Sequence, residues 1–223
     1  INDDPNYPGA LTGGISGGTG NTIQIQSVGS PRNSFYVYQQ VYDKLGNPID
    51  NLFVDRNRDG IISDKDLYKY KSPDPTVFLG VNSNVNYKKW SAGFVMRANI
   101  GNYVYNNVAS STGTARNILN PLGFLANGSS DLLKTNFSGN GSQYFLSDYY
   151  VQNASFLRMD NINVNYNFGK VLNNKTSLRV GAFVQNAFVI TSYKGVDPEI
   201  NGGIDNNFYP RPRVFALSVN LDF

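Results

Sequence analysis

The stretch RVFALSVNLDF, residues 213–223, alternates between two kinds of side chain from Phe215 onward. From Phe215 to Phe223 the odd positions are all apolar, and the even positions between them are small or polar. A period of two is typical of a β-strand with one apolar face. Ten steps of about 3.3 Å at a tilt of about 40° rise about 25 Å, the height of the lipid-facing band of a membrane barrel. The same parity fits a strand of a soluble sandwich, so it leaves both folds open.

Four further segments alternate in the same way, and they are residues 77–87, 90–100, 161–168 and 178–184. In the third of these every odd position is Asn, whereas the even positions from Ile162 to Phe168 are apolar. Amides left unpaired in a dry sandwich interior would each cost on the order of 1 to 3 kcal/mol, so a water-filled lumen suits this face better. We therefore predict an all-β fold, an antiparallel transmembrane β-barrel with long extracellular loops.

The composition excludes several classes of function. The 223 residues include no Cys and no His, which removes Cys/His zinc sites, disulfides and a Ser-His-Asp triad. Any metal must therefore be held by oxygen. The 19 basic and 16 acidic residues are scattered, so there is no basic stripe, and we expect no nucleic-acid partner. No residue pattern indicates catalysis, and we expect no enzyme activity.

The connections between the predicted strands alternate between short and long. Residues 87–90 form a tight turn and 169–176 a modest one, whereas 43–76, 106–143 and 192–208 are long and polar. We expect the long connections to be exterior loops. The apolar side chains of the middle loop should pack in a small core or against a partner; they are Ile118, Leu119, Leu122, Phe124, Leu125, Leu132, Leu133 and Phe137. Aromatic residues near the expected rims predict an interfacial girdle of Tyr87, Trp90, Tyr103, Tyr105, Phe168 and Tyr209.

One loop has the spacing of a calcium site. Residues 55–66 read DRNRDGIISDKD, which matches D-x-N-x-D-G-x-I-x-x-x-D. The predicted metal ligands are Asp55, Asn57, Asp59, the Ile61 carbonyl and Asp66. Because the last ligand is Asp rather than the longer Glu, the site would bind Ca²⁺ weakly or accept the smaller Mg²⁺. The alternative is a metal-free turn whose carboxylates are neutralised by its own basic residues.

A second acidic pair, Asp197 and Glu199, has no framework that sets its separation. General acid and base work on a sugar would need such a framework. We expect these two carboxylates to cap their loop or to pair with Arg211 and Arg213.

Several short motifs occur in an order and spacing that resemble the carboxyl-terminal part of SusC/RagA-type TonB-dependent outer-membrane transporters of the Bacteroidota. They are residues 55–60 (DRNRDG), 72–75 (SPDP), 101–106 (GNYVYN), 147–148 (SD), 154–158 (ASFLR), 185–186 (QN), 193–199 (YKGVDPE), 209–213 (YPRPR) and the aromatic Phe223. An aromatic residue that ends an apolar-face strand also resembles the assembly signal of bacterial outer-membrane barrels.

The resemblance implies a barrel of about 22 strands, of which residues 1–223 would be a carboxyl-terminal arc of about six or seven. It further implies location in the outer membrane and contact with its lipid, import of oligosaccharides or oligopeptides, a SusD-like surface lipoprotein on the exterior side, and energy from TonB. The remainder of the barrel, the plug, the TonB box and the signal peptide would lie outside this sequence.

Two other classes remain open at this stage. The chain could be a small self-contained outer-membrane barrel that acts as an adhesin or structural protein, although five confident strands are fewer than the eight that such a barrel needs. It could also be a secreted, calcium-dependent, sugar-binding β-sandwich, which would bury its apolar faces inward.

Overall fold

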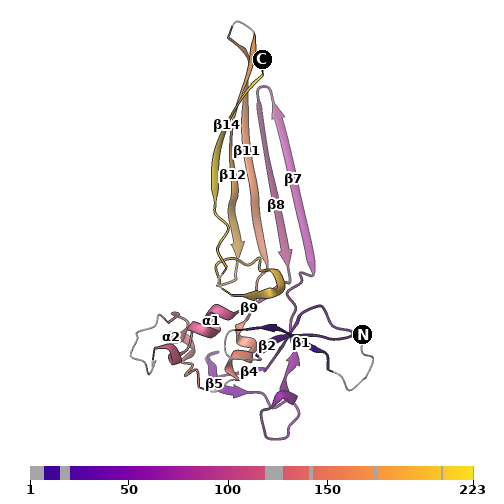
Figure 1. Ribbon diagram of the computed structural model, residues 1–223, viewed down its shortest axis with the longest axis vertical. Helices are drawn as coiled ribbons and strands as arrows, with labels where there is room; N and C mark the ends of the chain where they lie inside the picture. The colour runs from indigo at the N-terminus through magenta and orange to yellow at the C-terminus, as the bar shows by residue number, and fades with distance from the viewer. Residues whose placement is uncertain are drawn as a thin grey trace. The chain divides into compact units, whose positions relative to one another are not determined.

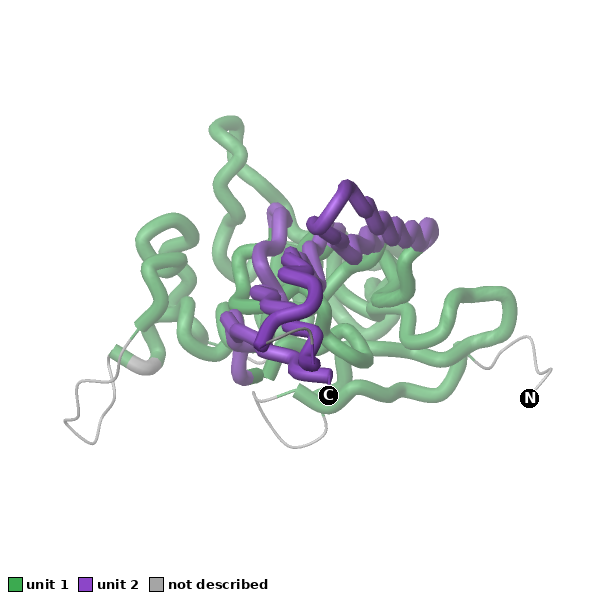
Figure 2. The backbone as a smooth tube through the Cα atoms, turned by 90° about the horizontal axis from the view of Figure 1, so that it is seen from above, with its two compact units in different colours: residues 1–75, 102–154, 193–208 green, residues 76–101, 155–192, 209–223 purple. Residues whose placement is uncertain are grey.

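The computed structural model describes residues 8–15, 21–118, 128–140, 143–172, 175–206 and 208–222. The chain divides into two compact units, which Figure 2 distinguishes by colour. Unit 1 comprises residues 1–75, 102–154 and 193–208, and unit 2 comprises residues 76–101, 155–192 and 209–223. Each unit is therefore built from three separate stretches of the chain.

Unit 2 is a single antiparallel sheet, which we call the wall sheet, with strand order β14-β12-β11-β8-β7 (Figure 1). Its strands are β7 (Val77–Tyr87), β8 (Trp90–Ile100), β11 (Phe156–Val171), β12 (Thr176–Thr191) and β14 (Val214–Asp222). Each predicted segment forms one strand, and the two central ones extend to 16 residues, well beyond the predicted ranges. Within the described residues the wall sheet has five strands, whereas six or seven were expected. Phe223, the last residue of the predicted terminal strand, lies outside the described residues.

The register confirms the two predicted faces of the wall sheet. Across the row at Val164, the neighbours are Val85, Ala92, Ala182 and Leu217. Because directly opposite residues in paired strands share a face, the predicted apolar positions lie together on one side, the apolar face. These side chains are not covered: Leu217 is 83% exposed and Phe215 is 71% exposed. The amides and other polar residues lie on the opposite side, the polar face.

The short and long connections also follow the prediction. The β7–β8 turn consists of two residues, with Tyr87 opposite Trp90 and Lys88 in the left-handed region at φ 53°. The β11–β12 hairpin pairs as far as Val171 and Thr176. The long connections leave the other ends of the strands and run through unit 1.

Unit 1 contains three small sheets and several short helices (Figure 1). One sheet has the order β1 (Ala10–Gly14), β2 (Thr22–Gln26), β3 (Ser34–Val37) and β6 (Tyr68–Lys69); another has the order β10 (Val151–Asn153), β9 (Tyr103–Asn106) and β13 (Ile204–Asp205); the third pairs β4 (Gln40–Tyr42) with β5 (Pro48–Phe53). The helices are α1 (Asn107–Thr112), α2 (Leu132–Thr135) and 3-10 turns at Asp64–Asp66, Ala115–Asn117, Tyr144–Leu146, Asp148–Tyr150 and Asn201–Gly203. No helix in the described residues is long and apolar enough to cross a membrane.

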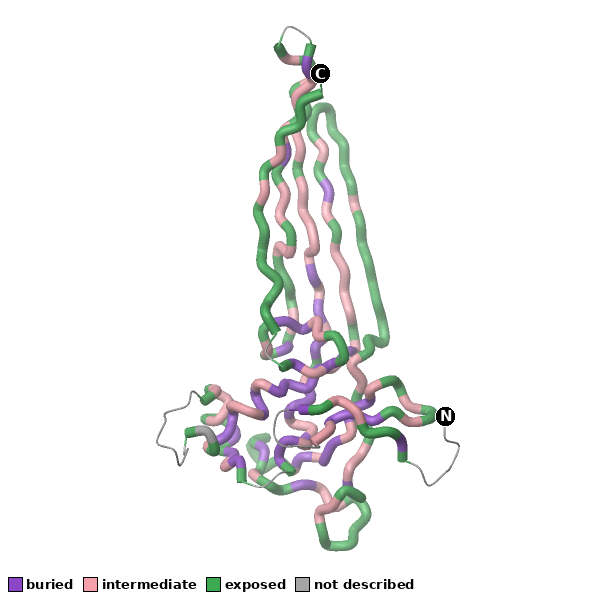
Figure 3. Tube along the Cα trace, viewed as in Figure 1, coloured by how far each residue is buried: buried purple, intermediate pink, exposed green. Residues whose placement is uncertain are grey.

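The long connections are more than polar loops, because they share a hydrophobic core. Figure 3 shows buried residues gathered in unit 1. The core of this unit includes Tyr105, Phe137 and Tyr150. The predicted small core is confirmed at Phe137, which is 1% exposed, whereas Leu133 is exposed. Leu119, Leu122, Phe124 and Leu125 lie outside the described residues.

Tyr105 is a correction to the predicted girdle. Its ring is fully buried in the core of unit 1, and its hydroxyl donates to the Phe145 carbonyl at 2.6 Å. At the short-turn end of the wall sheet, in contrast, Trp90 packs edge-on against Tyr166, with 4.7 Å between the ring centres. Tyr166 in turn packs edge-on against Phe168. Aromatic residues therefore do cluster at this rim, as expected for an interfacial position.

Candidate functional site

The polar face of the wall sheet carries a row of amides along β11. Asn163 donates through Nδ2 to Asn161 Oδ1 at 3.1 Å, and Asn165 donates through Nδ2 to Asn163 Oδ1 at 3.4 Å. Consecutive side chains on one face of a strand lie two residues apart, so this head-to-tail order follows directly from the sequence N-x-N-x-N. The row fixes the orientation of each amide without help from a buried core.

Two glycines flank this row on the neighbouring strands. Gly93 of β8 lies opposite Asn163, and Gly181 of β12 lies opposite Asn165. A Cβ at Gly93 would lie 2.3 Å from Asn84 Oδ1, and one at Gly181 would lie 2.2 Å from Asn165 Oδ1. The amides therefore lie across the glycines, close to the backbone, where any larger residue would displace them.

A β-bulge interrupts β11 beyond the amide row. Met159 and Asn161 pair with the adjacent residues Met96 and Val95 of β8, which leaves Asp160 as the extra residue. Arg97 Nε donates to Asp160 Oδ2 at 2.7 Å, and both side chains are about three-quarters buried, with exposures of 22% and 29%. The bulge thus re-aims a carboxylate toward the polar face.

The same bulge holds a buried arginine. Arg158 lies directly opposite Arg97 and is 1% exposed. It donates through Nη1 to Asn186 Oδ1 at 2.7 Å, and the guanidinium groups of both arginines lie over the Phe156 ring. Asn186 has a positive φ of 50° and donates through Nδ2 to the Arg211 carbonyl at 2.7 Å. Asn186 therefore ties Arg158 to the segment that leads into β14.

The alternation of residues 90–100 places Arg97 on the polar face but does not predict its pairing with Asp160. A signal was present: the apolar positions are odd at Leu157 and Met159 and even from Ile162 onward. Such a change of phase within one strand indicates a bulge. The acidic partner of Arg97 is the residue at the phase change.

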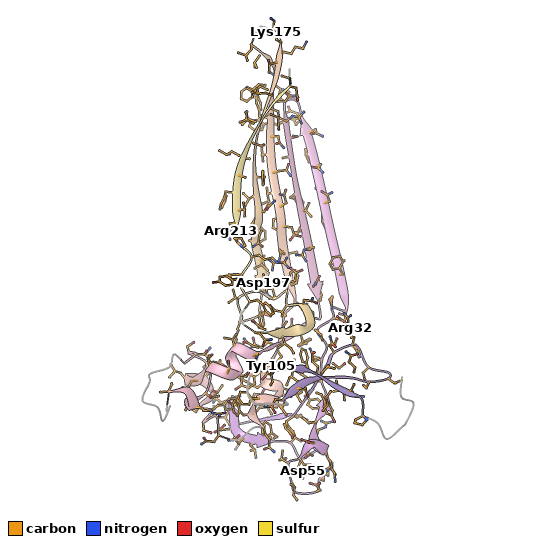
Figure 4. The ribbon with its side chains drawn as sticks, viewed as in Figure 1. Arg32, Asp55, Tyr105, Lys175, Asp197 and Arg213 are labelled. Atoms are coloured by element: carbon orange, nitrogen blue, oxygen red, sulfur yellow. The ribbon has the colours of Figure 1, made fainter. Side chains whose placement is uncertain are left out.

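The predicted metal loop lies in unit 1 between β5 and β6, where Figure 4 labels Asp55. Asp55 accepts hydrogen bonds from the backbone N–H groups of Arg58 and Gly60, and Asp59 accepts from Asn57 Nδ2 and from the Ile61 N–H. Gly60 has a φ of 84°, as the sharp turn requires. Three predicted ligands thus share one compact turn.

Asp66, the last predicted ligand, is fully buried and serves the backbone. Its Oδ1 accepts from the N–H groups of Arg56 and Asn57, and its Oδ2 accepts from Ser63. Hydrogen bonds from the N–H groups of Ser63, Asn57 and Arg56 lower the pKa of Asp66. This carboxylate closes the loop as a hydrogen-bond staple in its own right.

In the part of the chain that the structure describes, no group of three or more acidic side chains is arranged to hold a metal ion. The three predicted acidic ligands, Asp55, Asp59 and Asp66, therefore form no such group, and the calcium or magnesium site stays a prediction. All the predicted ligands in the loop are oxygen atoms, the type that both cations prefer.

Asp148, which the sequence showed only as part of the motif at residues 147–148, connects this loop to the core of unit 1. Asp148 accepts a hydrogen bond from the Gln40 N–H at 3.0 Å and from the Tyr68 hydroxyl at 2.7 Å. Burial raises the pKa of Asp148, although the Tyr68 bond acts against that rise. The Tyr68 ring in turn lies under the Arg56 guanidinium of the loop, 4.5 Å from ring centre to Cζ.

The acidic pair Asp197 and Glu199 lies in the loop between β12 and β13. Asp197, labelled in Figure 4, is 9% exposed, and its Oδ1 accepts a hydrogen bond from the Glu199 N–H at 2.9 Å. The expected capping role is therefore confirmed for Asp197.

Together these features define a class of protein. An antiparallel sheet with exposed apolar side chains on one face and amides on the other is the wall of a membrane β-barrel. In the described residues, β7 and β14 are each paired on one side only, and five strands are too few for a small closed barrel. The exposed apolar face also argues against a sandwich. The wall sheet is an arc of a larger barrel.

Comparison with known proteins identifies the relatives of this chain. It is 42% identical over 226 residues to the TonB-dependent receptor SusC of Bacteroides thetaiotaomicron, an alignment that covers 99% of the chain and 22% of the receptor. It is 27% identical over 200 residues to the TonB-dependent receptor P3 of Formosa agariphila, covering 79% of the chain and 19% of that receptor. The chain therefore spans about a fifth of the length of these relatives. No family model matches the chain.

Solved structures support the fold. The RagAB peptide transporter matches with a TM-score of 0.75 at 24% identity, over 92% of this chain and 24% of that one. The RagAB peptide importer in its open-open state matches with a TM-score of 0.71 and the same coverage. The resemblance to SusC/RagA-type TonB-dependent receptors is thus confirmed along nearly the whole chain, which is part of an outer-membrane β-barrel. The relatives are receptors and transporters rather than enzymes.

Proposed function

We propose that this chain forms barrel wall and exterior loops of a TonB-dependent importer of polar oligomers, either oligosaccharides or oligopeptides. The observation that carries the proposal is the two-faced wall sheet, whose apolar face suits lipid and whose amide face suits a water-filled passage. The identity to SusC supports the same function.

The partners belong to the same proposal. A SusD-like surface lipoprotein would contact the exterior loops, which unit 1 gathers into a folded body with its own core. The remainder of the barrel and a plug would complete the pore, and TonB would supply energy through a segment outside this sequence. Support comes from the SusC-type relatives.

The test is uptake by cells that carry the complete parent protein. Cells that express it should accumulate fluorescent oligosaccharides or oligopeptides too large for porins, and deletion of its gene should abolish the uptake. Collapse of the proton-motive force should stop accumulation while leaving surface binding intact. Accumulation that continues without energy would contradict an active importer.

We also propose that the loop from Asp55 to Asp66 binds Ca²⁺, or Mg²⁺, as a structural staple. The shared turn of Asp55, Asn57 and Asp59 and the oxygen character of all its ligands support this. The measurement is hydrogen exchange of residues 55–66 in the complete protein, with and without millimolar Ca²⁺. Slower exchange in wild type, absent in Asp59→Ala, is expected; equal exchange in both conditions would reject the metal.

A further inference from the structure

A hairpin and a short helix of unit 1 border an open cavity, which we call the hairpin cavity. Its volume is about 590 Å³, within the range of about 300 to 1,000 Å³ that is usual for small-molecule pockets. One wall is the β4–β5 hairpin, and the other is α2 with the residue that ends it (Figure 1). The polar lining consists of Asp43, Asn47 and Asp50 from the hairpin and of Lys134 and Asn136 from the helix side. All of these residues belong to unit 1.

The hairpin turn fixes its polar side chains by local hydrogen bonds. Asp43 Oδ1 accepts from the N–H groups of Leu45 and Asn47, each at 2.8 Å, and Asp43 Oδ2 accepts from Asn47 Nδ2 at 3.0 Å. The bonds from Asn47 lower the pKa of Asp43, so this carboxylate is ionised at neutral pH. The Asn47 amide has a second N–H and an oxygen in addition. The turn therefore holds a carboxylate and an amide in place before any ligand arrives.

Asp50 brings a second carboxylate to the same wall. Its Oδ2 accepts a hydrogen bond from the Ser138 N–H at 3.0 Å. Its Oδ1 is shielded from bulk water and has no hydrogen-bond donor among the described residues. Such an oxygen is unfavourable until a donor reaches it. Because Asp50 lines the cavity and is only partly buried, a ligand in the cavity can supply that donor.

The helix side of the cavity supplies donors and an apolar contact. Asn136 ends α2 in the left-handed region at φ 52°, and its N–H donates to the Leu132 carbonyl at 2.9 Å. In the part of the chain that the structure describes, the Asn136 side chain makes no hydrogen bond and Lys134 makes no ion pair. Leu133 is 83% exposed and lines the same wall. This wall thus offers an ammonium, an amide and a hydrocarbon surface.

The charges that line the hairpin cavity are mixed, which limits the class of ligand. An anionic group would meet Asp43 and Asp50, and a cationic group would meet Lys134, so each would face a like charge. A neutral hydroxyl suits both walls, because it donates to a carboxylate and accepts from an ammonium or an amide. Neighbouring hydroxyls of a sugar ring do this from adjacent atoms, whereas an extended peptide directs successive N–H groups to opposite sides.

We propose that the hairpin cavity binds a neutral sugar unit of an oligosaccharide. The carboxylates of Asp43 and Asp50 accept from its hydroxyls, Lys134 and Asn136 donate to them, and Leu133 contacts its C–H surface. This inference rests on the proposed function in taking the ligand to be one of the two substrate classes given there, and it adds the place and the chemistry of a contact.

The test uses the complete protein, purified in detergent. The probes are neutral oligosaccharides built from glucose, mannose, galactose, xylose or fructose, with neutral oligopeptides of similar length for comparison. Calorimetry measures the affinity for each probe. Hydrogen exchange then locates the contact, and the oligosaccharide that binds most tightly should slow exchange in residues 43–50 and 132–138.

Two variants remove contacts while sparing the backbone. Asn136→Gly removes the amide and retains the left-handed conformation, and it should weaken the affinity about three- to tenfold. Asn51→Gly is the matched control, because Asn51 also has a positive φ of 55° and is exposed but does not line the cavity; it should leave the affinity unchanged. Asp50→Asn is nearly isosteric, keeps an acceptor for the Ser138 N–H and should weaken the affinity by a similar factor.

Three results would overturn the inference. They are binding of none of the oligosaccharides, equal affinity in wild type, Asn136→Gly and Asp50→Asn, and slower exchange in residues 43–50 and 132–138 with the oligopeptides alone. The import function is tested separately by uptake in cells. Absence of energised uptake, with binding at the cavity intact in the purified protein, would overturn the import function and leave the sugar site standing.

Discussion

Arg97 on β8 and Asp160 on β11 form an ion pair at 2.7 Å because Asp160 is the extra residue of a β-bulge. Arg97 also lies directly opposite Arg158, and like charges in that position destabilise a sheet. The bulge thus supplies the carboxylate that makes an arginine pair tolerable within the wall.

The ion pair leads to a prediction about three variants. Asp160→Asn should destabilise the complete barrel by about 1 to 3 kcal/mol, because it leaves two guanidinium groups facing each other. Arg97→Met should also destabilise the barrel, because it leaves the mostly buried Asp160 carboxylate without its partner, whereas the double variant removes both charges of the pair and should lie nearer to wild type than either single variant. Heat-induced loss of the compact gel band in detergent measures the order; a double variant less stable than both single variants would refute the explanation.

The second prediction concerns the left-handed backbone conformation of Asn186. Its φ of 50° is easily adopted by Gly and Asn and costs other residues roughly 1 to 2 kcal/mol. Asn186→Gly should lose only the bonds to Arg158 and Arg211, whereas Asn186→Ala should lose those bonds and add strain. The same gel assay should rank Ala below Gly in stability. Equal stability would show that the left-handed conformation carries no cost.

Asp148 predicts a pH dependence in unit 1. Burial raises its pKa, so the folded state holds this proton more tightly than the unfolded state. The stability of unit 1 should therefore decrease as pH rises from about 4, the unfolded pKa, through the raised folded pKa, and then level off. Hydrogen exchange at the Gln40 amide, corrected for intrinsic rates, reports this. In Asp148→Asn the dependence in this window should vanish; its persistence would assign the effect to another group.

The strands of the wall could be predicted from sequence because their signal is local. Alternation within residues 161–168 or 215–222 needs no knowledge of partners, since each face contacts one solvent. The register of β11 and β12 was harder to predict from the sequence, because the irregularity at Asp160 and Asn186 depends on how β8, β11 and β12 pair with one another.

Unit 1 could not be predicted as a folded body. Its strands have two to six residues, and their partners are distant in sequence, as when β9 pairs with β10 and, in parallel, with β13. Tyr105 shows the consequence: an aromatic residue near the end of a predicted wall strand indicates a membrane interface by sequence but lies in this core. In the Asp55–Asp66 loop, the spacing predicted the turn but not that Asp66 would bond three backbone N–H groups.

The central claim is that one face of the wall sheet meets lipid and the other meets water. Because these 223 residues contain no Cys, a cysteine placed at one of positions 161 to 165 of β11 is the only one in this stretch. It can be labelled with nitroxide in the complete, reconstituted protein once any cysteine elsewhere has been replaced. The two-faced wall predicts greater collision with oxygen at Ile162 and Val164, and greater collision with a water-soluble nickel chelate at Asn161, Asn163 and Asn165. Equal accessibility along the five positions, or the reverse alternation, would contradict it.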